Sequence, residues 1–91
     1  MKKTIDICGI PYQVVECEDY FTGDSVHFGE IDIKQCKIQI AKDMSKEMKE
    51  QTLMHELLHG ILMTLGYTEE NENEQFVTAV SAAMYPIFKV R

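Results

Sequence analysis

The spacing of apolar residues changes once along this 91-residue chain, near residue 42. Before that point apolar and polar residues alternate in short runs, which is the pattern of half-buried β-strands. After it apolar residues recur every three or four positions, which is the pattern of amphipathic helices. A chain of this length holds one hydrophobic core. We therefore expect a single α+β domain over residues 1–91, in which a small N-terminal antiparallel or mixed sheet of three to four strands packs on two C-terminal helices.

Four runs in the first part of the chain are expected to form strands. A break at Gly9 and a turn segment over residues 18–24 separate the first three. The pair Lys34-Gln35 could close a hairpin between the last two, although it lacks the Asn-Gly or Asp-Gly that favours a two-residue turn. Gly29 interrupts the alternation of the third run, which predicts a β-bulge there. The expected strands are residues 4–8, 11–17, 25–33 and 36–40.

The first helix is expected to follow a cap at Asp43 or Ser45 and to run to about Leu65. Gly66 then supplies the left-handed residue that ends many helices. One face of this helix is apolar and should lie against the sheet. The residues of that face are Met54, Leu57, Leu58, Ile61, Leu62 and Leu65.

A polar connection over residues 67–72 is expected to lead to a second helix, which Asn71 or Asn73 can cap. Pro86 disfavours helical geometry at Tyr85, so we expect a kink or an early end there. The apolar residues that this helix carries are Phe76, Val77, Val80, Ala83, Met84 and Ile87.

Residues 55–59 read His-Glu-Leu-Leu-His, and this H-E-x-x-H motif lies inside the first expected helix. Two histidines four positions apart lie on one helix face, one turn from each other, so both imidazoles can bind one zinc ion. Glu56 points roughly 100° away from His55 around the helix, where it can act as general base on a water molecule activated by the metal. The motif therefore predicts two metal ligands, His55 and His59, and a catalytic Glu56.

A catalytic zinc ion usually has three protein ligands and one open position, so a third ligand must come from elsewhere in the chain. Carboxylates cluster just after the first helix. We favour Glu74, because it begins the second helix and its helix face continues through Val77 and Ser81 toward the expected core. Glu72 and Glu70 remain alternatives, since element boundaries read from a sequence err by about 2–4 residues.

Residues Thr52–Ile61 resemble the active-site helix of small zincin-type metallopeptidases, especially the ImmA/IrrE-like and related phage-encoded proteins. The resemblance covers roughly residues 25–88 and includes two strands before the motif. In that family an acidic third ligand opens a helix, which corresponds here to residues 73–77. The resemblance implies a minimal zincin-like fold, a zinc cofactor and hydrolysis of peptide bonds. It also implies that a peptide pairs with the sheet edge beside the helix, here the strand around residues 26–32.

The leading hypothesis is a zinc metallopeptidase that acts on a peptide or on one specific protein, such as a repressor. A non-catalytic, zinc-stabilised interaction module is the alternative. Such a structural site is closed by a fourth ligand, for which His27 or Cys36 could serve, and it has no use for Glu56. A metal-free adaptor descended from a peptidase is a third hypothesis.

Charge and cysteine content restrict the partners and the compartment. The formal net charge is −6, whereas nucleic-acid and anionic-membrane binders normally carry a basic face. No apolar run is long enough to span a membrane, and no signal-peptide segment follows the N-terminus. The three cysteines, Cys8, Cys17 and Cys36, are expected to be reduced core residues. We therefore expect a cytoplasmic protein.

Overall fold

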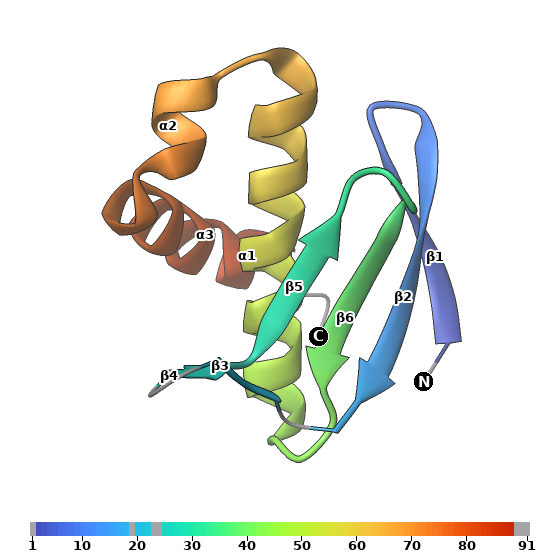
Figure 1. Cartoon of the computed structure of the whole chain (residues 1–91). Coiled ribbons are helices and arrows are strands. Elements are labelled where there is room, and N and C mark those ends of the chain that lie inside the picture. The colour runs from blue at the N-terminus through green and yellow to red at the C-terminus, as the bar shows by residue number, and fades with distance from the viewer. Residues whose placement is uncertain (1, 19, 23–24, 89–91) are drawn as a thin grey trace.

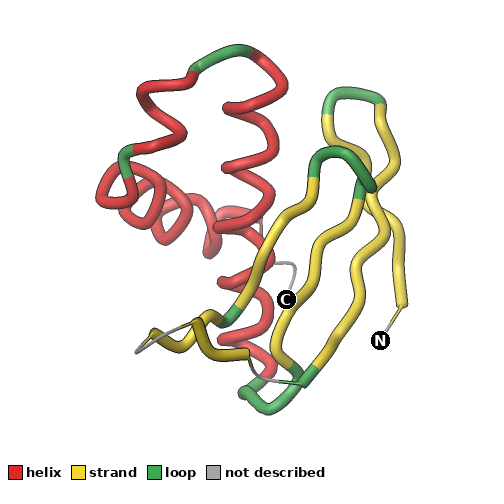
Figure 2. The backbone as a smooth tube through the Cα atoms, viewed as in Figure 1, coloured by secondary structure: helices red, strands yellow, loops and turns green. Residues whose placement is uncertain are grey.

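The computed structural model describes residues 2–18, 20–22 and 25–88 of the chain. A four-stranded mixed sheet forms one layer, and the helices all lie on one side of it (Figures 1 and 2). This arrangement confirms the expected α+β fold. The described elements are β1 (Lys2–Ile7), β2 (Ile10–Cys17), β3 (Tyr20–Thr22), β4 (Ser25–His27), β5 (Gly29–Asp32), β6 (Lys37–Ala41), α1 (Lys46–Leu65), α2 (Thr68–Glu72) and α3 (Glu74–Phe88).

The main sheet has the strand order β1-β2-β6-β5. β1 and β2 form an antiparallel hairpin, β2 and β6 are parallel, and β6 and β5 are antiparallel. The predicted break at Gly9 is confirmed, because Cys8 and Gly9 form the hairpin turn with φ angles of 52° and 86°. The same turn exposes Cys8 to solvent, so the expectation that Cys8 lies in the core is wrong.

The third expected strand is divided between two sheets. Its first part, β4, pairs with β3 in a separate two-stranded ribbon, and its second part, β5, is an edge strand of the main sheet (Figure 1). The chain bends at Phe28, between the two, so the interrupted alternation marks a change of sheet rather than the predicted bulge at Gly29. β3 lies within the expected turn segment, of which residues 19, 23 and 24 fall outside the described residues.

The hairpin between β5 and β6 is present, but its loop has four residues, 33–36, rather than two. The Asp32 side chain explains the longer loop, because its Oδ1 accepts a hydrogen bond of 3.1 Å from the Gln35 backbone N–H. Cys36 completes the turn with a φ angle of 53°. This hydrogen bond stabilises the turn, which lacks the Asn-Gly pair that favours a two-residue hairpin loop.

Both ends of α1 agree with the sequence. The Ser45 side chain caps the helix by accepting a hydrogen bond of 3.2 Å from the Met48 N–H. At the other end Gly66 adopts the left-handed conformation, with a φ angle of 86°. Among the described helices, none is long and apolar enough to cross a membrane.

The segment after α1 differs from the expected polar connection, because residues 68–72 form the short helix α2. Asn73 then caps α3, and its Oδ1 accepts a hydrogen bond of 3.1 Å from the Phe76 N–H. Of the kink or early end expected at Tyr85, the early end is wrong, since α3 continues through Pro86 to Phe88. Proline has no N–H to donate to the carbonyl oxygen of Ala82, so the last turn of α3 lacks one helix hydrogen bond.

The core lies between the sheet and α1. Its buried residues come from both layers and include Ile7, Tyr12, Val14, Ile38, Ile40 and Leu53. α3 packs on α1 on the side away from the sheet, so only a narrow stripe of α3 is covered. Val77 is buried as expected, whereas Phe76 is 38% exposed and Ile87 is 76% exposed.

Two glycines allow α1 to lie close to the sheet. A Cβ atom on Gly60 would lie 2.8 Å from a side-chain methyl carbon of Ile31 and equally close to one of Ile7. A Cβ atom on Gly29 would lie 2.6 Å from Cγ2 of Thr52 and 3.3 Å from Cγ of Glu56. The absence of a side chain at Gly29 therefore sets the distance between the edge strand β5 and the helix that carries the H-E-x-x-H motif.

We expect Gly29→Ala to lower the free energy of unfolding by about 1–3 kcal/mol, the usual cost of overpacking a well-filled site. The added methyl group must displace Thr52, which is itself buried. Urea unfolding followed by circular dichroism measures the change.

The matched control is Thr52→Ser, which removes the methyl group that would collide with the new Cβ. The loss caused by Gly29→Ala should be clearly smaller in the Thr52→Ser background than in wild type. Equal losses in the two backgrounds would contradict the proposed contact.

Candidate metal centre

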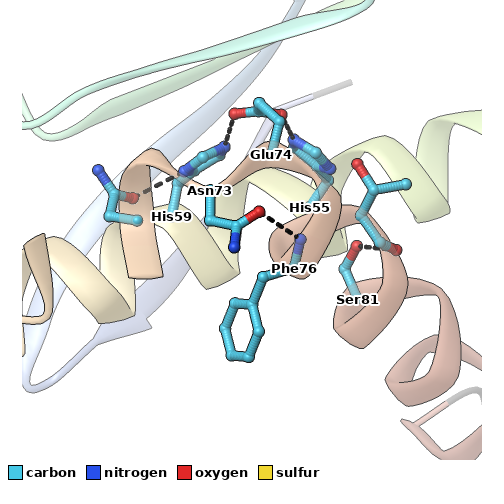
Figure 3. Close-up of polar contacts among 8 residues, drawn as sticks. His55, His59, Asn73, Glu74, Phe76 and Ser81 are labelled. Atoms are coloured by element: carbon cyan, nitrogen blue, oxygen red, sulfur yellow. Dashed lines mark hydrogen bonds and ion pairs between the residues drawn. The ribbon is translucent and has the colours of Figure 1, made fainter. Parts of the chain in front are cut away.

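Three side chains from two helices converge on one point. Nε2 of His55 lies 3.2 Å from Oε1 of Glu74, and Nε2 of His59 lies 2.8 Å from Oε2 of the same carboxylate. Figure 3 shows Glu74 lying across the two imidazoles, with its oxygens turned toward them. One ligand atom from each of the three residues can be chosen so that all lie within 4.8 Å of one another. The structure thus brings together the three residues chosen as ligands from the sequence.

The local structure explains this convergence. One turn of α1 separates His55 from His59, so their ring centroids are only 4.9 Å apart. Gly66 and α2 then reverse the chain, and the Asn73 cap starts α3 at Glu74, above the two rings. The Glu74 side chain is 67% exposed and therefore covers the histidines from the solvent side.

The other candidate ligands are not part of this group. Glu70 and Glu72 lie on α2, and both are exposed. Cys36 lies in the turn between β5 and β6, where its thiol contacts the Ile33 carbonyl oxygen at 3.7 Å. The side chain of His27 falls outside the described residues, so its role as a fourth ligand is not tested. Within the described part of the chain, only three ligands meet at this point.

The donor set fits a zinc ion. Two imidazole nitrogens and one carboxylate oxygen form one of the common catalytic zinc sets, and they leave a fourth position free. A tetrahedral ion about 2.0–2.1 Å from each donor would hold its ligands about 3.4 Å apart. The nitrogen–oxygen distances of 3.2 and 2.8 Å, each to a different oxygen of the Glu74 carboxylate, are close to that value. A small outward movement of Glu74 would admit the ion.

The electrostatics also favour a metal ligand at His55. Burial lowers the pKa of His55, and the neighbouring His59 lowers it further, whereas Glu74 opposes both effects. A lowered pKa keeps the imidazole neutral, and the neutral ring is the form that binds metals.

Glu56 lies next to the three ligands but is not one of them. It is only 8% exposed, and its Cγ packs against the backbone of Gly29. Burial raises the pKa of Glu56 to about 7; the charges of Glu74 and Glu30 raise it as well, while His59 lowers it. A carboxylate with a pKa near neutrality is well suited to accept and return a proton.

The site opens into a cleft of about 920 Å³ between β5 and α3, with α1 as its floor. Gly29, Glu30 and Ile31 of the edge strand form one wall. The residues that α1 contributes lie along one face of the helix over about three turns, so the cleft follows the helix axis. They are Met48, Gln51, Thr52, His55, Glu56 and His59.

One residue of the site was missed by the sequence analysis. Oδ1 of Asn71 on α2 lies 2.7 Å from Nδ1 of His59. In the sequence Asn71 is one of several polar residues in an acidic stretch, and its type indicates a helix cap as readily as a contact. Only the fold of α2 against α1 reveals the contact.

No protein-family model matches this chain, and no match was found among the curated proteins or the solved structures. A function must therefore be argued from the residues and their geometry. The features available for that argument are the three converging ligands, the buried Glu56 and the cleft beside an edge strand.

Proposed function

We propose that this protein is a zinc-dependent peptidase of the zincin type, as the resemblance to the ImmA/IrrE-like and related phage-encoded proteins implies. The observation that carries the proposal is the meeting of His55, His59 and Glu74 in one cleft with a buried Glu56. In this proposal the first three residues bind zinc, and Glu56 is the general base. A cytoplasmic location is part of the proposal, and the free state of the three cysteines supports it.

Each residue then has a defined role in peptide hydrolysis. Zinc, when bound, polarises a carbonyl group and lowers the pKa of water to about 7. Glu56 accepts a proton from the attacking water and later returns it to the amine that leaves. Its position against Gly29 keeps the carboxylate in the cleft wall beside the three ligands.

The edge strand β5 supports a peptide as substrate. Within the main sheet β5 pairs with β6 on one side only, and the cleft lies along its residues 29–31. An extended peptide can add to such an edge through backbone hydrogen bonds. A peptide bound in this way would run between β5 and the three ligands, next to Glu56.

The alternative, a closed structural zinc site, receives less support. A structural site is four-coordinate, whereas the described residues bring three ligands together. A buried Glu56 beside the ligands also costs stability, and a purely structural site gains nothing from that cost.

We expect the purified protein to bind one zinc ion per chain, because the three ligands converge. The double variant His55→Ala/His59→Ala should lose the zinc, and Glu74→Ala should bind it much more weakly. Elemental analysis gives the content, and competition with a chelating dye gives the affinity.

Glu70→Ala is the matched control, because it also removes one carboxylate but from an exposed position on α2. It should bind zinc as wild type does. Equal zinc content in wild type and in the double histidine variant would refute the site, and weakening by Glu70→Ala rather than Glu74→Ala would refute the third ligand.

Hydrolysis is tested by incubating the zinc-loaded protein with a broad peptide library and identifying new termini by mass spectrometry. Cleavage by wild type that is absent from the double histidine variant would support the proposal. If wild type binds zinc but cleaves no peptide in the library, the non-catalytic module becomes the better hypothesis.

A further inference from the structure

The ring of His59 is contacted at both of its nitrogens. Nδ1 lies 2.7 Å from Oδ1 of Asn71, and Nε2 lies 2.8 Å from Oε2 of Glu74. The two partners come from different helices, α2 and α3. His55 is less constrained: in the described part of the chain its polar contacts are confined to Nε2, which faces Glu74.

Asn71 also differs from its neighbours on α2. It is half-buried, whereas the four other residues of this short helix are exposed. The helix itself is held by a hydrogen bond of 2.9 Å from the Asn71 N–H to the Tyr67 carbonyl oxygen. α2 therefore turns one polar side chain inward, and that side chain meets a predicted zinc ligand.

We propose that Asn71 is a positioning residue that fixes the orientation of His59 toward the metal. Its carbonyl oxygen accepts a hydrogen bond from Nδ1–H of His59. That bond leaves the lone pair on Nε2, and it holds the ring so that Nε2 points to the place where the three ligands converge. Partners of this kind, beyond the ligands themselves, typically change metal affinity by about 10–100-fold.

The proposal depends on the zinc site proposed above but not on peptide hydrolysis. A protein that binds zinc without cleaving any peptide would still use Asn71 in this way. Zinc affinity and the state of the His59 ring are therefore the quantities to measure.

Asn71→Leu and Asn71→Asp form the informative pair. Leucine has a similar size but cannot accept a hydrogen bond, whereas aspartate can only accept one. We expect Asn71→Leu to weaken zinc binding by about 10–100-fold and Asn71→Asp to bind at least as tightly as wild type. Glu72→Gln, an exposed change on the same helix, should leave the affinity unchanged.

Nuclear magnetic resonance of the zinc-loaded protein tests the hydrogen bond itself. It therefore distinguishes a positioning role of Asn71 from a merely structural one. In wild type the Nδ1–H proton of His59 should be protected from exchange with water, and Asn71→Asp should retain this protection. Asn71→Leu should lose it while keeping the circular dichroism spectrum of wild type.

The outcomes separate the two proposals. If wild type binds no zinc, both fall. If zinc binds but the His59 Nδ1–H proton of wild type exchanges freely, or if Asn71→Leu binds zinc as tightly as wild type, only the role of Asn71 is overturned. The wild-type measurement decides the question even if Asn71→Leu does not fold.

Discussion

Replacing Glu56 with glutamine should lower the rate of peptide hydrolysis by about 10²–10⁴-fold while leaving the zinc content unchanged. Glutamine keeps the size of the side chain and its capacity for hydrogen bonds, but it cannot accept the proton from water. Zinc should remain because Glu56 is not one of the three converging ligands. The measurement is kcat on a peptide identified in the library screen, together with elemental analysis of both proteins.

Glu72→Gln is the control for this experiment, since Glu72 is an exposed carboxylate on α2 that does not line the cleft. It should retain most of the activity. If Glu56→Gln cleaved as fast as wild type, the mechanism would be wrong. If the variant lost zinc together with activity, Glu56 would be a ligand rather than the base.

Burial of Glu56 should destabilise the metal-free protein progressively as pH rises from about 4.5 to about 7. Its pKa is about 7 in the folded protein against an ordinary value of 4.5. Below pH 4.5 the carboxyl is protonated in both the folded and the unfolded chain, so the folded state carries no penalty there. Between the two values the unfolded chain loses the proton first. Above about pH 7 the full cost, about 3 kcal/mol, is present.

Urea unfolding of chelator-treated wild type and Glu56→Gln at about pH 5 and about pH 8 tests this expectation. The variant should be the more stable protein at the higher pH, and the difference should shrink at the lower one. His55 acts with the opposite sign, because its lowered pKa makes the folded state less stable as pH falls below the ordinary value of 6.5. Both proteins contain His55, so the difference between their curves isolates Glu56. Parallel curves would refute the burial cost assigned to Glu56.

Both predictions concern the Glu56 carboxylate, whose burial favours catalysis in the proposed mechanism but lowers the stability of the metal-free protein. Burial against Gly29 raises the pKa of Glu56 toward the range that suits a general base, and the same burial destabilises the metal-free fold. Such a cost is common where function requires a buried ionisable group.

Local chemistry made several features predictable. The alternating runs identified the strands of the main sheet. A cap at Asp43 or Ser45 and the left-handed backbone favoured at Gly66 predicted the ends of α1. The four-residue spacing of His55 and His59 is a property of any α-helix, so their proximity required no knowledge of the fold. The start of α3 places Glu74, rather than its acidic neighbours, beside the two histidines, and its role as a ligand stays a prediction.

Other features depended on which elements pack together. α3 is apolar enough to suggest a core helix, yet it rests on α1 rather than on the sheet, and so leaves Phe76 and Ile87 exposed. The short helix α2 has no apolar periodicity and is held by the chain reversal after α1. Apolar periodicity in the sequence indicates which face of a helix is buried, but it does not indicate which other element covers that face.

The sequence by itself determined the class of fold, the motif helix and two neighbouring imidazoles, because strand alternation and helix periodicity act over a few residues. Only the tertiary structure decided that Glu74 lies across those imidazoles, that Gly29 brings the edge strand against Glu56, and that Asn71 meets His59. These contacts join residues on different elements. Their distances are set by the packing of whole helices and strands, which no local pattern encodes.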